Sequence, residues 1–221
     1  YTQKEMNQIR DIVKKYNLYL FSDEVYREFI YTGSPYISAM HLKGIQNNVV
    51  LIDSVSKRYS ECGIRIGALI TKNDAVRKTV MKFCQARLSP PLIGQLIAEA
   101  SIEGTEAYSR DVYEEYTERR KCLIDGVNRI AGCYTPIPMG AFYTVAKLPV
   151  DDAEKFCAWC LEKFCYKDEH TPEGYVGETI MMAPAAGFYT NTEYGKNQVR
   201  LAYVLCKQDL QRALVILEKA L

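Results

Sequence analysis

Residues 54–67 read SVSKRYSECGIRIG and lie at the junction of two short apolar runs. They bring two hydroxyls, an amine and a guanidinium close together in the sequence, on Ser54, Ser56, Lys57 and Arg65. In open α/β sheets ligands bind at the carboxyl ends of the strands, and serine hydroxyls together with the planar fork of an arginine hold a phosphate well. This stretch therefore predicts a phosphate site with a lysine beside it.

A lysine in that setting can lose its proton readily enough to form a Schiff base with an aldehyde cofactor. Taken by themselves, the residues are equally compatible with Lys57 and Arg65 being surface charges on a loop, because single Lys and Arg side chains are mostly exposed. Both interpretations stay open on the strength of this stretch alone.

Three short apolar runs rich in β-branched and aromatic residues occur in the first part of the chain, namely LYLFSD (18–23), VVLIDSVS (49–56) and RIGALI (65–70). Each is too short for a helix and too continuously apolar for a sheet with one wet face. We expect them to be buried parallel strands. Helical patterns flank them, so the first 70 or so residues are predicted to be a piece of an α/β sheet.

Helical periodicity is strongest at the start of the chain. Thr2 followed by Glu5 forms a capping box, apolar residues then recur at helical spacing, and Asn17 is a plausible end, which predicts a helix over residues 3–16. Further helices are expected over about 74–86, 92–103, 106–130 and 152–165, and from residue 208 onward. Later strands are expected within the runs 134–149, 179–184 and 198–205.

The long charged helix expected over 106–130 can bridge two domains, and the sequence after it changes to a strand-like run broken by Pro and Gly. We therefore expect a partial large domain over residues 1–130, which includes this connecting helix. A small α+β domain is expected over residues 131–221.

The bulk composition favours a small ligand. The chain has 28 Lys and Arg against 27 Asp and Glu, a net charge of +1 and no basic run, so nothing indicates nucleic acid or a membrane surface. No apolar stretch approaches the roughly 20 residues needed to span a bilayer, and we expect a cytosolic protein. The eight cysteines are scattered, and Cys157, Cys160 and Cys165 have no matching second pair, so free thiols are expected and no metal site is predicted.

An acidic residue ends the first apolar run: LYLFSDEVYREF carries Asp23 at the strand end and Tyr26 three residues later. An Asp at this place could pair with a protonated ring nitrogen, and the phenol could hydrogen-bond a ring oxygen. Alone, the two residues favour a local explanation, in which Asp23 ends the strand or caps the next turn and Tyr26 packs.

Arg200 stands in the strand-like run QVRLAYVL, where alternation places it on the same face as Ala202 and Val204. A guanidinium on such an apolar face needs an anion. A protein carboxylate is the more common partner, and a substrate carboxylate held in a bidentate fork is the other possibility.

Four motifs together resemble the aspartate-aminotransferase-like (class I/II) branch of the fold-type I pyridoxal-phosphate (PLP) enzymes. The family's Asp-x-x-Tyr is present as DEVY (23–26), and its S-x-S-K with an Arg eight residues after the Lys as SVSKRYSECGIR (54–65). Its P-x-G-A-F-Y is present as PMGAFY (138–143), and its late arginine strand as VRLAYV (199–204). The resemblance covers essentially the whole chain, and the joint match is far more specific than any one motif.

The resemblance implies roles for individual residues. Lys57 would carry PLP as a Schiff base and, once displaced by the substrate amine, would move a proton between the substrate Cα and the cofactor. Asp23 would keep the pyridine nitrogen protonated, and Tyr26 would hydrogen-bond the ring 3′ oxygen. Ser54 and Arg65 would hold the phosphate, with Ser56 also matching the motif. Arg200 would hold the substrate α-carboxylate.

The resemblance also implies a fold: the C-terminal portion of the PLP-dependent transferase large domain, a mostly parallel sheet with helices, plus a small α+β domain. The family's N-terminal half, which includes a phosphate loop and a ring-stacking aromatic, has no counterpart here, so we expect a C-terminal fragment that is inactive alone. Family members usually build each active site between two subunits, which implies a homodimer for the intact parent. The chain departs from the family at Ala185, where a Gly often follows the Pro.

The implied function of the parent is transfer of an amino group between an amino acid and a 2-oxo acid. A PLP-dependent carbon–sulfur lyase, or another PLP enzyme of this fold, is an alternative because the same cofactor residues serve several chemistries. A third hypothesis is a folded, non-catalytic module that self-associates through uncovered strand edges.

Overall fold

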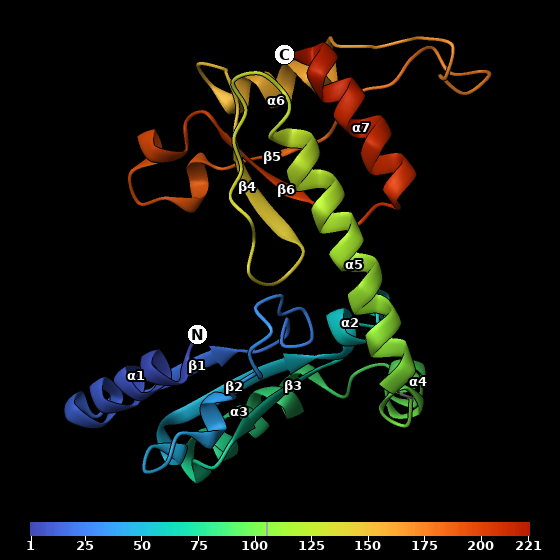
Figure 1. Ribbon diagram of the computed structural model, residues 1–221. Helices are drawn as coiled ribbons and strands as arrows, with labels where there is room; N and C mark the ends of the chain where they lie inside the picture. Colours follow the sequence, from blue (N-terminus) through green and yellow to red (C-terminus); the bar gives the residue numbers. More distant parts are fainter. Residues whose placement is uncertain (105) are drawn as a thin grey trace. The chain divides into compact units, whose positions relative to one another are not determined.

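The computed structural model describes residues 1–104 and 106–221 (Figure 1). They form two compact units, Tyr1–Asp111 and Val112–Leu221, and the division falls within the long helix α5 (Glu106–Val127). The domain boundary expected after residue 130 stays a prediction.

The first unit combines a three-stranded sheet with helices. Its strands are β1 (Leu20–Asp23), β2 (Val49–Ser54) and β3 (Gly67–Thr71). Its helices are α1 (Gln3–Tyr16), the one-turn α2 (Val55–Arg58), α3 (Asp74–Arg87) and α4 (Leu92–Ile102). Short 3-10 turns η1 (Ala39–His41), η2 (Gln46–Asn48) and η3 (Cys62–Ile64) lie in the connections.

Helix α1 has the ends that the sequence predicts. The hydroxyl of Thr2 accepts a hydrogen bond from the backbone N–H of Glu5 at 3.3 Å, and the Glu5 carboxylate accepts one from the backbone N–H of Thr2 at 2.7 Å. The helix stops at Asn17, whose backbone is left-handed with φ 48°, a conformation that Asn tolerates better than most residues.

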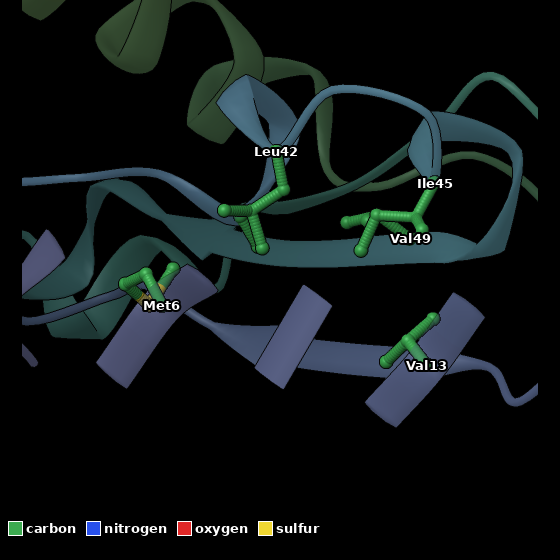
Figure 2. Close-up of a cluster of buried hydrophobic side chains, with 6 residues drawn as sticks. Met6, Val13, Leu42, Ile45 and Val49 are labelled. Carbon is green, nitrogen blue, oxygen red and sulfur yellow. The ribbon is translucent and has the colours of Figure 1, made fainter. Parts of the chain in front are cut away.

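The core beneath the sheet is a cluster of buried apolar side chains from α1, η1, β2 and the loop between η1 and β2. Figure 2 shows the side chains of α1 pointing toward those of the loop and of β2. The members of the cluster are Met6, Val13, Ala39, Leu42, Ile45 and Val49. This packing holds α1 against the sheet.

The strand order is β1-β2-β3, with β1 parallel to β2 and β2 antiparallel to β3. The expectation of three parallel strands is therefore wrong for the third. The connection over residues 55–66 contains only short turns, and a parallel return needs a crossover that is usually a full helix. Burial also differs from the expectation, because Val49, Val50 and Leu51 are buried while Phe21 and most of β3 are exposed.

The second unit is built on an antiparallel sheet of order β4-β6-β5, from β4 (Tyr143–Lys147), β5 (Ala183–Pro184) and β6 (Gln198–Ala202). Its helices are the C-terminal part of α5, α6 (Ala153–Glu162) and α7 (Lys207–Ala220), with 3-10 turns η4 (Ala186–Phe188) and η5 (Thr192–Gly195). The observed strands are shorter than the predicted runs. Helices α5 and α6 end at Val127 and Glu162, three residues earlier than predicted for both.

Burial alternates along β6, as the sequence predicts. Val199, Leu201 and Tyr203 are buried, whereas Arg200 is exposed. The face that Arg200 shares with Ala202, as the alternation predicts, is therefore not the apolar interior of the unit. The alternation itself was predicted correctly, but the choice of the inner face depends on the helices that cover the sheet.

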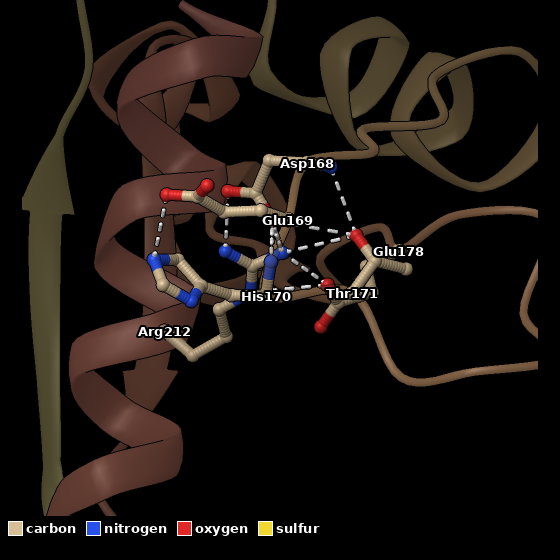
Figure 3. A network of polar contacts seen from close by, with 6 residues as sticks. All are labelled: Asp168, Glu169, His170, Thr171, Glu178 and Arg212. Carbon is tan, nitrogen blue, oxygen red and sulfur yellow. Dashed lines mark hydrogen bonds and ion pairs between the residues drawn. The ribbon is translucent and has the colours of Figure 1, made fainter.

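A polar network fastens the loop between α6 and β5 to α7 (Figure 3). Arg212 of α7 donates to both oxygens of Asp168, each at 2.8 Å, and to Glu178 with its Nε at 3.0 Å. Thr171 is a further partner at 3.3 Å. The guanidinium of Arg212 thus donates hydrogen bonds to three residues of this loop.

In the described part of the chain, no helix combines the length and the apolar character needed to cross a membrane.

Candidate functional site

The site predicted in the first unit lies at the carboxyl edge of the parallel pair. Asp23 ends β1 and is paired with Ile52 of β2, and the backbone N–H of Glu24 donates to the carbonyl of Ile52 at 2.9 Å. Because β1 and β2 are parallel, the turn after β1 and helix α2 after β2 leave the sheet at the same edge. The residues around Asp23 and those around Lys57 are therefore brought together by strand pairing.

Ser54 organises the end of β2 as the N-cap of α2. The backbone N–H of Ser56 donates to its hydroxyl at 3.1 Å, which is the usual capping bond of a helix start. The Ser54 hydroxyl also lies 2.9 Å from the carbonyl of Ile66 and 2.7 Å from the hydroxyl of Ser56. A hydroxyl has one proton to donate, so Ser54 donates to Ile66 and Ser56 donates to Ser54.

Arg65 returns the chain to β3 through a left-handed backbone with φ 59°, which is uncommon outside glycine. Its Nη1 donates to the carbonyl of Cys62 at 2.9 Å, and the side chain is exposed. A cavity of about 360 Å³ is lined by Ser54, Ser56 and Arg65 together with residues of β2 and β3. The three predicted phosphate residues thus surround one space.

Arg87, the last residue of α3, also lines this cavity. Nothing in the sequence pointed to it. A basic residue in the last turn of a helix is ordinary because it complements the helix dipole, so its position gave no separate signal.

Lys57 lies in the middle of α2, and its Nζ is 5.8 Å from the centre of the Tyr26 ring. Tyr26 in turn packs edge-on against Phe29, with ring centres 6.4 Å apart. Asp23 accepts a hydrogen bond from the backbone N–H of Val25 at 3.2 Å, which is the local turn that its residue type favours. Of the predicted cofactor residues, these three do not line the cavity that Ser54, Ser56 and Arg65 share.

Glu24 is buried and anchors the turn that carries Tyr26. One of its carboxylate oxygens accepts from the backbone N–H of Ala39 at 2.9 Å and from the hydroxyls of Ser22 at 2.9 Å and Ser38 at 3.2 Å. Burial, and then this carboxylate, raise the pKa of Tyr36 above its ordinary value. Sequence reasoning gave Glu24 no role, because its partners in η1 lie some distance along the chain.

Arg200 belongs to the second unit, where its guanidinium lies close to two aromatic rings. Its guanidinium carbon is 4.9 Å from the centre of the Tyr143 ring and 5.2 Å from that of Phe188. Among the described residues no carboxylate pairs with it. Stacking of this kind holds a guanidinium flat while its edge remains able to bind a planar anion.

Among the described residues, no group of three or more His, Cys, Asp or Glu side chains could hold a metal ion. Cys157 and Cys160 are buried in α6, whereas Cys165 is exposed.

The arrangement of the elements matches a known class of enzyme structure. An aromatic aminotransferase from Pyrococcus horikoshii matches this structure with a TM-score of 0.81 at 23% sequence identity, over 99% of this chain and 55% of that one. This confirms the expected fold class: part of the α/β large domain of the PLP-dependent aminotransferases followed by a small α+β domain.

Sequence comparison identifies the family. The sequence model of the family Aminotransferase class I and II matches residues 1–186, and the chain belongs to this family. Its members depend on PLP. The chain is 27% identical to the aspartate aminotransferase of Pyrococcus horikoshii, over 96% of this chain and 51% of that protein. It is 26% identical to the glutamate-pyruvate aminotransferase of Escherichia coli, over 92% of this chain and 46% of that protein. The chain thus spans about half the length of these relatives.

Proposed function

We propose that this chain serves PLP-dependent transfer of an amino group between an amino acid and a 2-oxo acid. The observation that carries the proposal is the cavity lined by Ser54, Ser56 and Arg65 at the carboxyl edge of β1 and β2. Lys57 follows Ser56, one of the residues that line this cavity, in the sequence. The relatives named above are aminotransferases, which supports the reaction class.

The residues that line this cavity and those at the same edge of the sheet fit the chemistry of PLP. Two hydroxyls and a guanidinium suit a phosphate, and Lys57 supplies the amine for the cofactor aldehyde. Asp23 would face the pyridine nitrogen and Tyr26 the 3′ oxygen. The protonated ring withdraws electrons from the substrate Cα when the cofactor is bound. Lys57 would accept the Cα proton and return it.

Arg200 would bind the α-carboxylate of the amino acid. The rings of Tyr143 and Phe188 both contact the guanidinium, and no carboxylate among the described residues pairs with it. A flat, uncompensated guanidinium is suited to bidentate binding of a substrate carboxylate.

We also propose that the intact parent protein is a homodimer. Helix α4 exposes Leu92, Ile93 and Leu96, and Leu88 just before it is 74% exposed. Exposed apolar side chains grouped in this way mark interaction surfaces in soluble proteins, and a second copy of the chain is the simplest partner. The division into a large-domain part over 1–130 and a small domain over 131–221 is proposed with it. The cytosolic location and the inactivity of the chain by itself stay predictions.

The proposal is tested by mixing the purified chain with PLP, reducing with borohydride and mapping the labelled peptide by mass spectrometry. We expect the label on Lys57 in the unmodified chain, and none at that position in Lys57→Ala. Lys72→Ala, which removes an exposed lysine of the same unit, is the matched control and should leave the label unchanged. Label spread over many lysines, or equal in Lys57→Ala, would count against a cofactor site.

A further inference from the structure

Two guanidinium groups meet one carboxylate oxygen beside Lys57. Nη2 of Arg27 lies 2.8 Å and Nη2 of Arg58 lies 2.9 Å from the same oxygen, Oδ2 of Asp53. The Asp53 side chain is 13% exposed, that of Arg58 19% and that of Arg27 25%. These groups are therefore largely removed from water, unlike the exposed ion pairs that contribute little to stability.

A second carboxylate closes the network. Oε1 of Glu28 lies 3.2 Å from Nε of Arg58 and 3.6 Å from Nε of Arg27. The other oxygen of Asp53, Oδ1, accepts from the backbone N–H of Ser54 at 2.9 Å. Two positive and two negative side chains balance one another, so the network adds no net charge near Lys57, and its effect on Lys57 is one of position.

The network joins the three segments that carry the predicted cofactor residues. Arg27 and Glu28 directly follow Tyr26 in the turn after β1, Asp53 is the penultimate residue of β2, and Arg58 is the last residue of α2. A helix of one turn has no stability of its own in water. The place of α2 therefore depends on its two ends, the Ser54 cap at one and the Arg58 ion pairs at the other.

We propose that Arg58 is a positioning residue for Lys57. By bridging Asp53 and Glu28 it fixes α2 against the turn after β1, and this keeps the Lys57 amine over the ring of Tyr26. The inference rests on the proposed function for the chemistry of Lys57, but the positioning itself concerns only residues of this chain. Arg58 acts through Lys57 and touches neither cofactor nor substrate.

The first test is the selectivity of PLP labelling in Arg58→Gln, Arg58→Lys and Asp53→Asn. We expect the label on Lys57, relative to all other lysines, to fall about tenfold in Arg58→Gln. Arg58→Lys should recover part of the loss, because an ammonium can reach one carboxylate but cannot form the fork that reaches two. Arg77→Gln, which breaks an exposed ion pair with Asp74 in the same unit, is the matched control and should label like the unmodified chain.

The second test needs no cofactor. Hydrogen exchange of the peptide covering residues 54–60 reports on α2, where the Tyr59 N–H donates to Val55 at 3.0 Å, and the peptide covering α1 is the internal reference. We expect exchange in 54–60 to quicken about tenfold in Arg58→Gln and in Asp53→Asn, with α1 unchanged.

The outcomes separate the two proposals. Unselective labelling of the unmodified chain, with faster exchange in 54–60 in the variants, would contradict the cofactor site and support the positioning role of Arg58. Selective labelling of Lys57 that Arg58→Gln leaves intact, with exchange unchanged in 54–60, would overturn the positioning role and leave the cofactor site standing. Equal acceleration of α1 and α2 would also overturn it, since Arg58 would then stabilise the whole unit.

Discussion

Arg212 and Asp168 form a two-point ion pair in which each guanidinium nitrogen, Nη1 and Nη2, lies 2.8 Å from its own carboxylate oxygen. Hydrogen bonding from Arg212 lowers the pKa of Asp168 and is also the main cause of the lowered pKa of Glu178. Both carboxylates belong to the loop that follows α6. The stability of this loop should therefore depend on pH.

The direction of these pKa shifts determines whether the stability rises or falls with pH. A carboxylate whose pKa is lower in the folded state stabilises that state above its unfolded pKa, about 4 for Asp and Glu, and loses this contribution as the pH falls further. We expect Arg212→Gln to lower the Tm by several degrees at pH 6, because two carboxylates lose their partner. The difference in Tm between the two proteins should shrink from about pH 4 downward. Thermal unfolding followed by circular dichroism at several pH values measures both effects.

The matched control for Arg212→Gln is Lys207→Gln. Lys207 pairs with Glu118 at 3.2 Å, but both side chains are at least half exposed, and such pairs contribute little. Its Tm should match that of the unmodified chain at every pH. If the Tm difference between Arg212→Gln and the unmodified chain stayed constant down to pH 2, Asp168 and Glu178 would not be the source of the pH dependence.

The core under the first sheet gives a prediction about packing. Ile45 is 2% exposed and belongs to the cluster that holds α1, so Ile45→Ala should lower the free energy of unfolding by about 2–4 kcal/mol through the cavity it leaves. Ile12 on α1 is 51% exposed. Ile12→Ala should therefore change the free energy of unfolding by less than about 0.5 kcal/mol. Urea titration compares the two, and equal losses would show that the cluster does not hold this unit together.

Gly94 in α4 allows the helix to approach the loop that precedes Arg65. A Cβ at this position would stand 2.8 Å from the carbonyl oxygen of Ile64, a backbone atom. Gly94→Ala should therefore destabilise the unit by about 1–3 kcal/mol, despite the better helix propensity of Ala. Gly63→Ala meets no atom within 4 Å and should be nearly neutral. A stabilised Gly94→Ala in urea titration would contradict this packing.

The cysteines should differ in reactivity. Burial raises the pKa of Cys160 to about 11, with a smaller effect from Cys157, whereas Cys62 and Cys84 are exposed. At pH 8 a thiol with a pKa near 11 is only about 0.1% thiolate, the reactive form. Iodoacetamide should therefore modify Cys62 and Cys84 at least about 100-fold faster than Cys160, as peptide mapping over time would show. In urea all three should react alike, and early modification of Cys160 in the native chain would contradict its burial.

Features that depend on near neighbours in the chain could be predicted. The ends of α1 follow from Thr2, Glu5 and Asn17, which act within one or two turns of the helix. The sequence predicted that Ser54, Ser56, Lys57 and Arg65 converge. Of these, Ser54, Ser56 and Arg65 line one cavity and Lys57 does not.

Features that depend on distant partners could not be predicted. The predicted direction of β3 was wrong, because apolar composition does not distinguish a parallel from an antiparallel neighbour. The exposure of Arg200 could not be predicted, because alternation divides a strand into two faces without saying which one the helices cover. The ion pairs of Arg58 with Asp53 and Glu28, and of Arg212 with Asp168 and Glu178, gave no sequence signal, since charged residues are common and mostly exposed.

The sequence by itself determined the family, the helix starts and the motif residues at the edge of the sheet, because local backbone preferences and residue chemistry are encoded within short stretches. The tertiary structure alone decided which side chains meet. Lys57 lies over Tyr26, and Arg58 beside Asp53 and Glu28, because the parallel pairing of β1 with β2 brings two distant turns to one edge. Strand pairing and core packing are long-range interactions, so the contacts they create cannot be read from either segment alone.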